Sequence, residues 1–224
     1  SQGFLERVAE GGPSLFAIDE AHCISSWGHA FRPEYKRLDI LKKVFPNVPL
    51  IALTATADKA VRGDIARHLG MRNERLFTSS FDRPNLSRAV LPGQNRWPML
   101  QRIMLRHAGE CGIIYCNSRN GTEKLAAQLQ GIGVKADFYH ARMDATDRDS
   151  VQDSFIQGHT HVICATIAFG MGIDKGDVRF VIHWNMPGTL EGYYQEIGRA
   201  GRDGAPAETI LFYSYADVQT HMHF

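Results

Sequence analysis

The chain has 224 residues, a formal net charge of +1 and 44% hydrophobic residues. This composition excludes a disordered chain, because enough apolar surface is available to bury and no net charge opposes collapse. No apolar run approaches the roughly 18 residues needed to cross a bilayer, and no secretory signal opens the chain. Since basic residues are not in excess, any nucleic-acid binding must use a local patch.

The chain alternates between short apolar runs and segments with helical spacing. The apolar runs predict strands at residues 15–18, 50–53, 112–115, 135–139, 161–164, 180–182 and 209–212. The helical spacing predicts helices at residues 33–44, 58–69, 97–107, 118–130, 144–156 and 189–197. Strand and helix in alternation indicate an α/β fold with a mostly parallel sheet and helices on both faces.

The clearest break is residues 79–94, where Asp82-Arg83-Pro84-Asn85 and Pro92-Gly93 predict turns and extended chain. We expect a domain boundary near Arg83, with domains at residues 1–83 and 84–224. The first part holds only two or three predicted strands, too few for a free-standing doubly wound sheet. We therefore expect it to be the C-terminal part of a larger lobe.

Two polar motifs follow the first two predicted strands. Asp19-Glu20-Ala21-His22 follows residues 15–18, at a carboxyl edge where open α/β sheets bind ligands. One carboxylate can hold Mg²⁺ through water while the next polarises an attacking water; the alternative is a solvated turn. Thr54-Ala55-Thr56 follows the next strand, so its hydroxyls should lie on the same edge, although a threonine there can also cap the following helix.

Residues 195–204 read Gln-Glu-Ile-Gly-Arg-Ala-Gly-Arg-Asp-Gly and give the strongest signal. Arg199 and Arg202 are planar cations that suit phosphate oxygens, and the surrounding glycines let the backbone approach closely. An arginine supplied from another domain can stabilise charge on a transferred phosphoryl group. The alternative is a glycine-rich surface turn that carries two arginines.

These motifs occur in the order found in superfamily 2 helicases. The stretch Cys-Ile-Ser-Ser-Trp-Gly-His-Ala-Phe-Arg-Pro-Glu-Tyr at residues 23–35 narrows the resemblance to the RecQ family of ATP-dependent DNA helicases. Supporting stretches lie at residues 113–119, 139–141 and 165–175. The resemblance covers nearly the whole chain and implies RecA-like lobes, namely the C-terminal part of the first and nearly all of the second.

The resemblance implies the cofactors ATP and Mg²⁺ and a set of nucleotide-binding residues. Asp19 would hold Mg²⁺ through water, Glu20 would activate water, and Arg202, assisted by Arg199, would be the arginine finger. His22, Thr54 and Thr56 would couple nucleotide state to DNA. The other residues implied in catalysis or ATP binding are Gln195, Gly170, Gly172 and Asp174.

DNA is the implied partner, single-stranded or duplex. Trp27, Phe31 and Arg32 would sense single strands, since aromatic faces stack on bases; the alternative is that Trp27 and Phe31 form a local core pair. Ser118, Arg119 and Thr166 are candidate backbone-phosphate contacts, although Ser118 is equally well explained as a helix cap. A single-strand-binding protein is a further candidate partner. No membrane partner is expected.

The chain has no phosphate-binding loop of the form G-x-x-x-x-G-K-[ST]. We therefore expect a partial chain that by itself hydrolyses ATP poorly or not at all. The resemblance implies that the longer protein is a 3′-5′ DNA helicase that acts in recombination or repair. The alternatives are a non-catalytic helicase remnant that binds nucleic acid or protein, and an RNA-directed motor of the same superfamily. The four cysteines form no C-x-x-C pair, so any zinc site is expected only downstream of this chain. Reduced thiols predict a cytoplasmic protein, associated with the nucleoid, or a nuclear one in a eukaryote.

Overall fold

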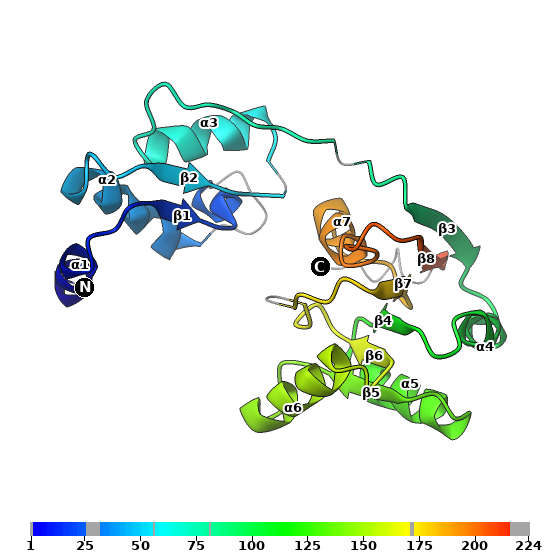
Figure 1. The fold of residues 1–224 in the computed structure, drawn as a ribbon. Coiled ribbons are helices and arrows are strands. Elements are labelled where there is room, and N and C mark those ends of the chain that lie inside the picture. Colours follow the sequence, from blue (N-terminus) through cyan, green and yellow to red (C-terminus); the bar gives the residue numbers. More distant parts are fainter. Residues whose placement is uncertain (1, 26–31, 56, 81, 171–172, 216–224) are drawn as a thin grey trace. The chain divides into compact units, whose positions relative to one another are not determined.

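The computed structural model describes residues 2–25, 32–55, 57–80, 82–170 and 173–215. The chain forms two compact units, Ser1–Ser79 and Ser80–Phe224, which are unit 1 and unit 2 below (Figure 1). Among the described residues, no helix has both the length and the apolar character that a membrane span requires.

Unit 1 is built on two short parallel strands. Strand β1 (Phe16–Ile18) pairs with β2 (Leu50–Ala52), with Phe16 opposite Leu50. Five helical elements accompany them: α1 (Gln2–Glu10), the 3₁₀ helices η1 (Ala21–Ile24) and η2 (Pro33–Asp39), α2 (Ile40–Val44) and α3 (Lys59–His68). Because both strands run in the same direction, the segments after Ile18 and Ala52 leave the sheet at the same edge.

The core of unit 1 fixes η1 against α3. Ile18, Ala21 and Ile24 pack with Val61 and Ile65 in one buried cluster. Helix α3 begins where predicted, because the Asp58 side chain accepts a hydrogen bond from the Val61 amide at 2.8 Å. The segment that follows the first strand is therefore held by hydrophobic packing on one side and by the sheet edge on the other.

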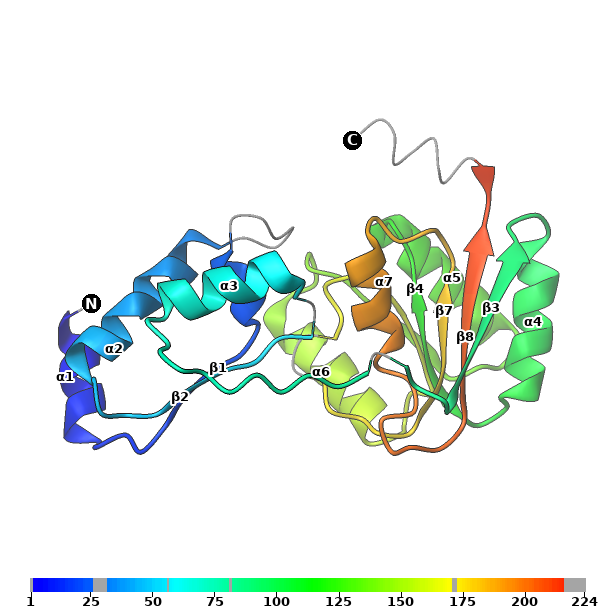
Figure 2. The same cartoon turned by 90° about the horizontal axis from the view of Figure 1, so that it is seen from above.

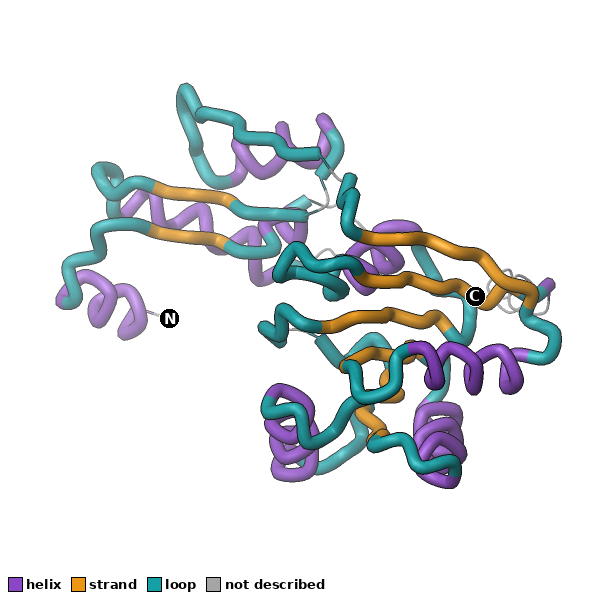
Figure 3. The backbone as a smooth tube through the Cα atoms, turned by 45° about the vertical axis from the view of Figure 1, so that its right-hand side comes forward, coloured by secondary structure: helices purple, strands orange, loops and turns teal. Residues whose placement is uncertain are grey.

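Unit 2 is a six-stranded sheet in the order β3-β8-β7-β4-β6-β5, and all its paired strands are parallel. Its elements in chain order are β3 (Leu86–Pro92), α4 (Arg96–Arg106), β4 (Cys111–Tyr115), α5 (Arg119–Gly131), β5 (Ala136–Tyr139), α6 (Ala145–Ile156), β6 (Val162–Ala165), β7 (Val178–His183), α7 (Leu190–Ile197) and β8 (Ala207–Tyr213). Figure 3 shows the strands as orange tubes lying side by side.

Helices cover both faces of this sheet. Residues of α4 and α5 pack in one buried cluster with one face of the strands, and residues of α6 and α7 pack in a second cluster with the other face. Figure 2 shows α7 and α4 on opposite sides of the sheet. Strand β4 is buried along its whole length, which explains its unbroken apolar sequence. The α/β class, the parallel sheet and the two helical layers predicted from the sequence are confirmed.

Three sequence-based expectations need correction. Leu86–Pro92 is strand β3, paired with β8 over its whole length, whereas this part of residues 79–94 was expected to be turns and extended chain. The predicted helix at residues 33–44 is a 3₁₀ helix up to Asp39 before α2 begins. Helix α1 was not predicted from the sequence.

Candidate functional site

The acidic motif begins directly after β1. Asp19 is exposed, and the Glu20 backbone amide donates a hydrogen bond to Asp19 Oδ1 at 2.8 Å. Glu20 has a φ of 49°, a left-handed conformation that is uncommon for a residue with a side chain. The Ala21 amide then donates to the Leu53 carbonyl at 2.9 Å. This backbone turn presents both carboxylates at the carboxyl edge of the strand pair.

His22 connects the acidic motif with the threonine motif. Its Nδ1 lies 2.9 Å from Thr54 Oγ1 and 3.3 Å from Glu20 Oε2. Because the His22 residue is only 8% exposed, its ring is fixed between these two groups. The structure therefore brings Glu20, His22 and Thr54 together, whereas Thr56 lies outside the described residues.

A second contact ties the acidic motif to α3. Ser25 Oγ donates a hydrogen bond to Asp64 Oδ2 at 2.9 Å, and Arg67 Nη1 donates to Asp64 Oδ1 at 2.8 Å. Asp64 and Ser25 are buried. This connection therefore holds the residue immediately before residues 26–32, which contain Trp27, Phe31 and Arg32 and which we name the aromatic loop. The sequence analysis missed Asp64, since an acidic residue within a helix carries no motif signal of its own.

The aromatic loop is described only at its end. Trp27 and Phe31 lie outside the described residues. Arg32 is exposed, and its backbone amide donates to the Cys23 carbonyl at 2.9 Å. This hydrogen bond places the Arg32 backbone beside the η1 helix, and the residue is exposed.

Arg199 and Arg202 lie in residues 198–206, which we name the arginine loop. Arg199 donates from Nη1 to the Gly170 carbonyl, and Arg202 donates from Nη1 to the Ile173 carbonyl at 3.0 Å. Gly170 has a φ of 126°, and a side chain there would collide with the Arg199 guanidinium. The glycine is thus required both by its backbone conformation and by the approach of Arg199.

Asp174 forms a long ion pair with Arg202. Its Oδ1 lies 3.8 Å from Arg202 Nη1, and its side chain is 96% exposed. An exposed pair of this kind contributes little free energy, so both groups are available to a ligand. Gln195 lies in α7, half-buried, one helical turn before Arg199; Gly172 lies outside the described residues.

A buried pair below the arginine loop was missed by the sequence analysis. His183 Nε2 lies 2.6 Å from Glu196 Oε2, and the residues are 1% and 8% exposed. Tyr115 stacks on the His183 ring with centroids 5.5 Å apart. Burial raises the pKa of the Tyr115 hydroxyl, and the nearby Arg199 partly offsets this increase. Two features of the sequence could have indicated this pair. His183 ends an apolar strand, and Glu196 directly follows Gln195.

The candidate phosphate contacts lie at a different edge of the unit 2 sheet. Ser118 and Arg119 follow β4 and Thr166 follows β6, so all three lie at the carboxyl ends of neighbouring strands. Ser118 Oγ accepts the Gly121 amide at 3.1 Å, which makes it the cap of α5. The arginine loop instead meets the amino end of β7, where the Gly201 amide donates to the Val178 carbonyl.

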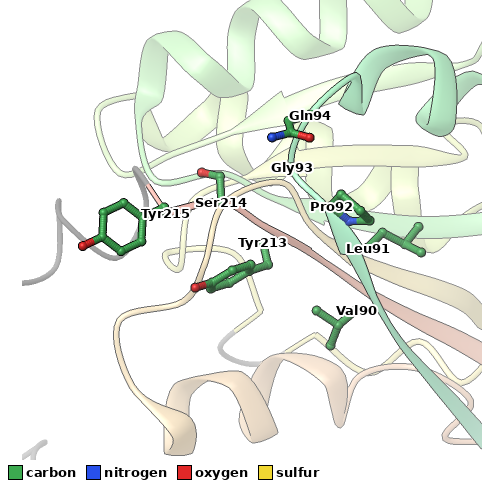
Figure 4. A pocket seen from close by; sticks show the side chains of 8 residues that line it. All are labelled: Val90, Leu91, Pro92, Gly93, Gln94, Tyr213, Ser214 and Tyr215. Carbon is green, nitrogen blue, oxygen red and sulfur yellow. The ribbon is translucent and has the colours of Figure 1, made fainter.

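An apolar pocket lies at the carboxyl ends of β3 and β8, and no predicted site residue lines it. Figure 4 shows its lining residues, which are Val90, Leu91, Pro92, Gly93, Gln94, Tyr213, Ser214 and Tyr215. No group of three or more histidine, cysteine or acidic residues within the described ranges is placed to hold a metal ion.

The chain resembles known helicases throughout. Residues 95–204 match the model of the helicase conserved C-terminal domain. The ATP-dependent DNA helicase RecQ of Pasteurella multocida is 50% identical over 214 residues, which are 96% of this chain and 34% of the relative. The RecQ-like DNA helicase BLM of Xenopus laevis is 52% identical over 207 residues, 91% of this chain and 15% of the relative. The chain thus spans about a third of the length of its bacterial relative.

Solved structures agree on the fold. The structure of Saccharomyces cerevisiae Dbp5 bound to RNA and ADP BeF₃ superposes with a TM-score of 0.72 at 19% identity, and the match covers 94% of this chain and 56% of that chain. Likeness at this identity concerns architecture alone, whereas the identity of about half to the RecQ proteins extends over nearly every residue. The chain is therefore similar, over nearly its whole length, to part of the RecQ helicases.

Proposed function

We propose that this chain forms part of the motor of an ATP-dependent 3′-5′ DNA helicase that acts in recombination or repair. The observation that carries the proposal is the contact of His22 with Thr54 and Glu20 at the edge of β1 and β2, in a chain half identical to RecQ helicases. A solvated turn does not need a buried imidazole that bonds to the next strand's exit. In a phosphoryl-transfer site, such a contact would link the acidic motif to the threonine motif.

The acidic motif supplies the hydrolytic groups. Asp19 is exposed and acceptor-only when ionised, which suits Mg²⁺, because this cation keeps several waters and takes one or two carboxylates together with phosphate oxygens. Bound Mg²⁺-ATP would supply the phosphoryl group and the charge that neutralises its oxygens. Glu20 Oε2 is held near His22 and activates the attacking water by accepting its proton.

The arginines supply positive charge from the second unit. The Arg202 side chain is 38% exposed, and its partners among the described residues are an exposed carboxylate and backbone carbonyls. It can therefore turn to the transferred phosphoryl group at small energetic cost, and an arginine of this kind raises turnover by about 10³–10⁵-fold. Arg199 contacts Gly170 and anchors the start of the arginine loop. Gln195, Gly172 and Asp174 complete the proposed nucleotide contacts.

DNA binding is assigned to two sets of residues. Trp27, Phe31 and Arg32 form the proposed sensor for single strands, with aromatic stacking worth roughly 1–3 kcal/mol per base. Ser118, Arg119 and Thr166 are exposed or half-exposed at one edge of the unit 2 sheet, which suits backbone-phosphate contacts. Binding to a single-strand-binding protein is a further proposal. In bacteria we expect this motor at the nucleoid, and in eukaryotes in the nucleus.

The test of the catalytic proposal is Glu20→Gln in the complete polypeptide that the gene encodes. We expect DNA-stimulated ATP hydrolysis to fall by at least 100-fold while ATP still binds, because the amide keeps the shape but cannot accept the proton from water. Glu34→Gln is the matched control, since Glu34 is an exposed acidic residue of the same unit. Turnover near the wild-type rate in Glu20→Gln would sink the proposal and favour a non-catalytic helicase remnant.

The DNA sensor is tested by Trp27→Ala. We expect the basal ATP hydrolysis to persist and its stimulation by single-stranded DNA to be lost, because base stacking at Trp27 is removed. Stimulation by RNA is measured in parallel. Equal stimulation of wild type and variant would show that the loop does not sense single strands, and a preference for RNA would indicate an RNA-directed motor.

A further inference from the structure

Arg83 and Asn85, which belong to none of the predicted sites, bind the backbone of the arginine loop. Arg83 donates from Nη2 to the carbonyls of Ala200 and Gly201 at 3.1 and 2.7 Å. Asn85 donates from Nδ2 to the carbonyls of Gly201 and Ala205, both at 2.9 Å. The carbonyls on both sides of Arg202 are therefore bonded to one short segment that lies more than a hundred residues earlier in the chain.

The two side chains also bond to each other, and the backbone of Asn85 bonds to the sheet. Arg83 Nε donates to Asn85 Oδ1 at 3.4 Å, which sets the orientation of the Asn85 amide with its nitrogen toward the loop. The Ala207 amide donates to the Asn85 carbonyl at 2.9 Å, where β8 begins beside β3. Because this segment is fixed to the sheet, it is a rigid support for the arginine loop.

The other side of the loop is held by Arg179. This residue donates from Nη2 to Asp203 Oδ2 at 2.6 Å and from Nη1 to the Pro206 carbonyl at 3.2 Å. The hydrogen bond from Arg179 also lowers the pKa of the Asp203 carboxyl. The loop is thus held from two directions, and the Arg202 side chain between them is left partly free.

Arg83 lies in the segment that connects the two units. Residues 69–85 connect α3 of unit 1 to β3 of unit 2, and the two units divide at Ser79 and Ser80. The connecting segment therefore reaches the sheet of unit 2 at the same place where it bonds to the arginine loop. Arg83 and Asn85 therefore lie where this segment joins the sheet of unit 2.

We propose that Arg83 and Asn85 are positioning residues for the arginine loop, and that through them the segment joining the two units sets where Arg202 lies during ATP hydrolysis. This inference rests on the proposed function. Neither residue touches the nucleotide. Both act by fixing the carbonyls of Ala200, Gly201 and Ala205, and hence the Cα position from which Arg202 reaches the phosphoryl group. Small displacements of such a group reduce catalysis strongly.

The test uses Asn85→Asp and Arg83→Ala in the complete polypeptide. Asn85→Asp keeps the shape of the side chain but sets a carboxylate oxygen against two carbonyl oxygens. We expect kcat for ATP to fall by about 10–100-fold in each variant, as a displacement of roughly 1 Å predicts, while KM for ATP changes by less than about threefold. Affinity for ADP–aluminium fluoride should fall by a similar factor to kcat, and affinity for ADP should not.

Two controls separate positioning from damage to the fold. Arg88→Ala removes an exposed cation from the same region, where Arg88 pairs with exposed Asp82 at 3.6 Å, and should leave ATP hydrolysis unchanged. Arg83→Lys restores the charge and one of the two hydrogen bonds, so it should recover part of kcat. Thermal unfolding of each variant records any loss of stability.

The decisive measurement is a double-mutant cycle with Arg202→Ala. If Arg83 acts through Arg202, adding Arg83→Ala to Arg202→Ala produces no further loss of kcat. Additive losses, or a fall in kcat that is matched by a rise in KM, would overturn the inference while the proposed function stands. If instead the wild-type polypeptide hydrolyses no ATP, the proposed function fails, and this inference fails with it.

Discussion

The buried pair of His183 and Glu196 allows a quantitative prediction about the free energy of unfolding. Glu196→Ala removes the acceptor that lies 2.6 Å from His183 Nε2. Because His183 is 1% exposed, water does not replace that acceptor, and within the described part of the chain its Nδ1 has no hydrogen-bond partner either. A buried donor left unsatisfied costs about 1–3 kcal/mol, so we expect the free energy of unfolding to fall by that amount.

Glu196→Gln makes the prediction specific. The amide oxygen keeps the reach of the carboxylate and still accepts from Nε2, so only the charge-assisted part of the hydrogen bond is lost. We expect a loss of about 0.5–1.5 kcal/mol for this variant. At about 2–4 °C per kcal/mol, Tm should fall by about 2–12 °C for alanine and by about 1–6 °C for glutamine.

The assay is thermal and urea unfolding followed by circular dichroism, with Glu191→Gln as the control. Glu191 lies exposed in the first turn of the same helix, and its replacement should change stability by no more than about 0.5 kcal/mol. Wild-type stability in Glu196→Ala would refute the reasoning, because the pair would then be solvated. Equal losses in both variants would show that packing, and not the acceptor, is responsible.

Two further predictions follow from the core of unit 2. Gly112→Ala places a methyl group on the Phe180 ring and should destabilise the protein by about 1–3 kcal/mol. The control Gly131→Ala, with open space at its Cβ position, should be neutral or stabilising by up to about 1 kcal/mol. Urea unfolding measures both variants, and equal effects would contradict the packing argument. Burial raises the pKa of the Cys116 thiol from 9.0 to about 12, so its thiolate fraction at pH 8 is about 10³-fold lower than in the unfolded chain and alkylation should be correspondingly slow. The same shift means that its contribution to stability is complete below about pH 9 and is lost as the pH rises toward 12, which unfolding midpoints across that range measure; a midpoint that does not fall would contradict it.

The sequence predicted the sheet of unit 2 well because its central strands are buried on both faces. Strand β4 reads as an unbroken apolar run, and β6 and β7 nearly so. Strand β3 was missed for the opposite physical reason. It is an edge strand with exposed Ser87 and Arg88, and turn residues flank it on both sides. Edge strands share few of the signals that mark a buried strand.

The candidate site was predictable only in part. The acidic motif and the threonine motif follow strands that turned out to be neighbours, so parallel topology was enough to expect Thr54 near Glu20. No such rule connects His183 with Glu196 or Arg83 with Gly201, because these contacts depend on how α7 and the arginine loop cross the sheet. Helix crossing and loop course are set by tertiary packing, and local sequence patterns do not encode them.

The composition of the arginine loop explains why it needs support from distant side chains. Gly198, Gly201 and Gly204 allow a tight course close to the sheet, but glycines also raise the conformational entropy that folding must remove. The loop has few side chains that pack, so its backbone carbonyls are the groups that can be held. Arg83, Asn85 and Arg179 each donate at least two hydrogen bonds to that loop or its carbonyls.

Carbonyl-directed support has a consequence for substitutions in the loop itself. Ala205 contributes its backbone carbonyl to the support of the arginine loop, so its side chain can change without loss of the Asn85 hydrogen bond. Asn85 has no equivalent freedom, because a side chain without an amide nitrogen removes the hydrogen bond to the Ala205 carbonyl and leaves Arg83 to hold the Gly201 carbonyl. The residues that fix the proposed catalytic arginine are therefore less replaceable than much of the loop that carries it, although no pattern of phosphate chemistry in the sequence marks them.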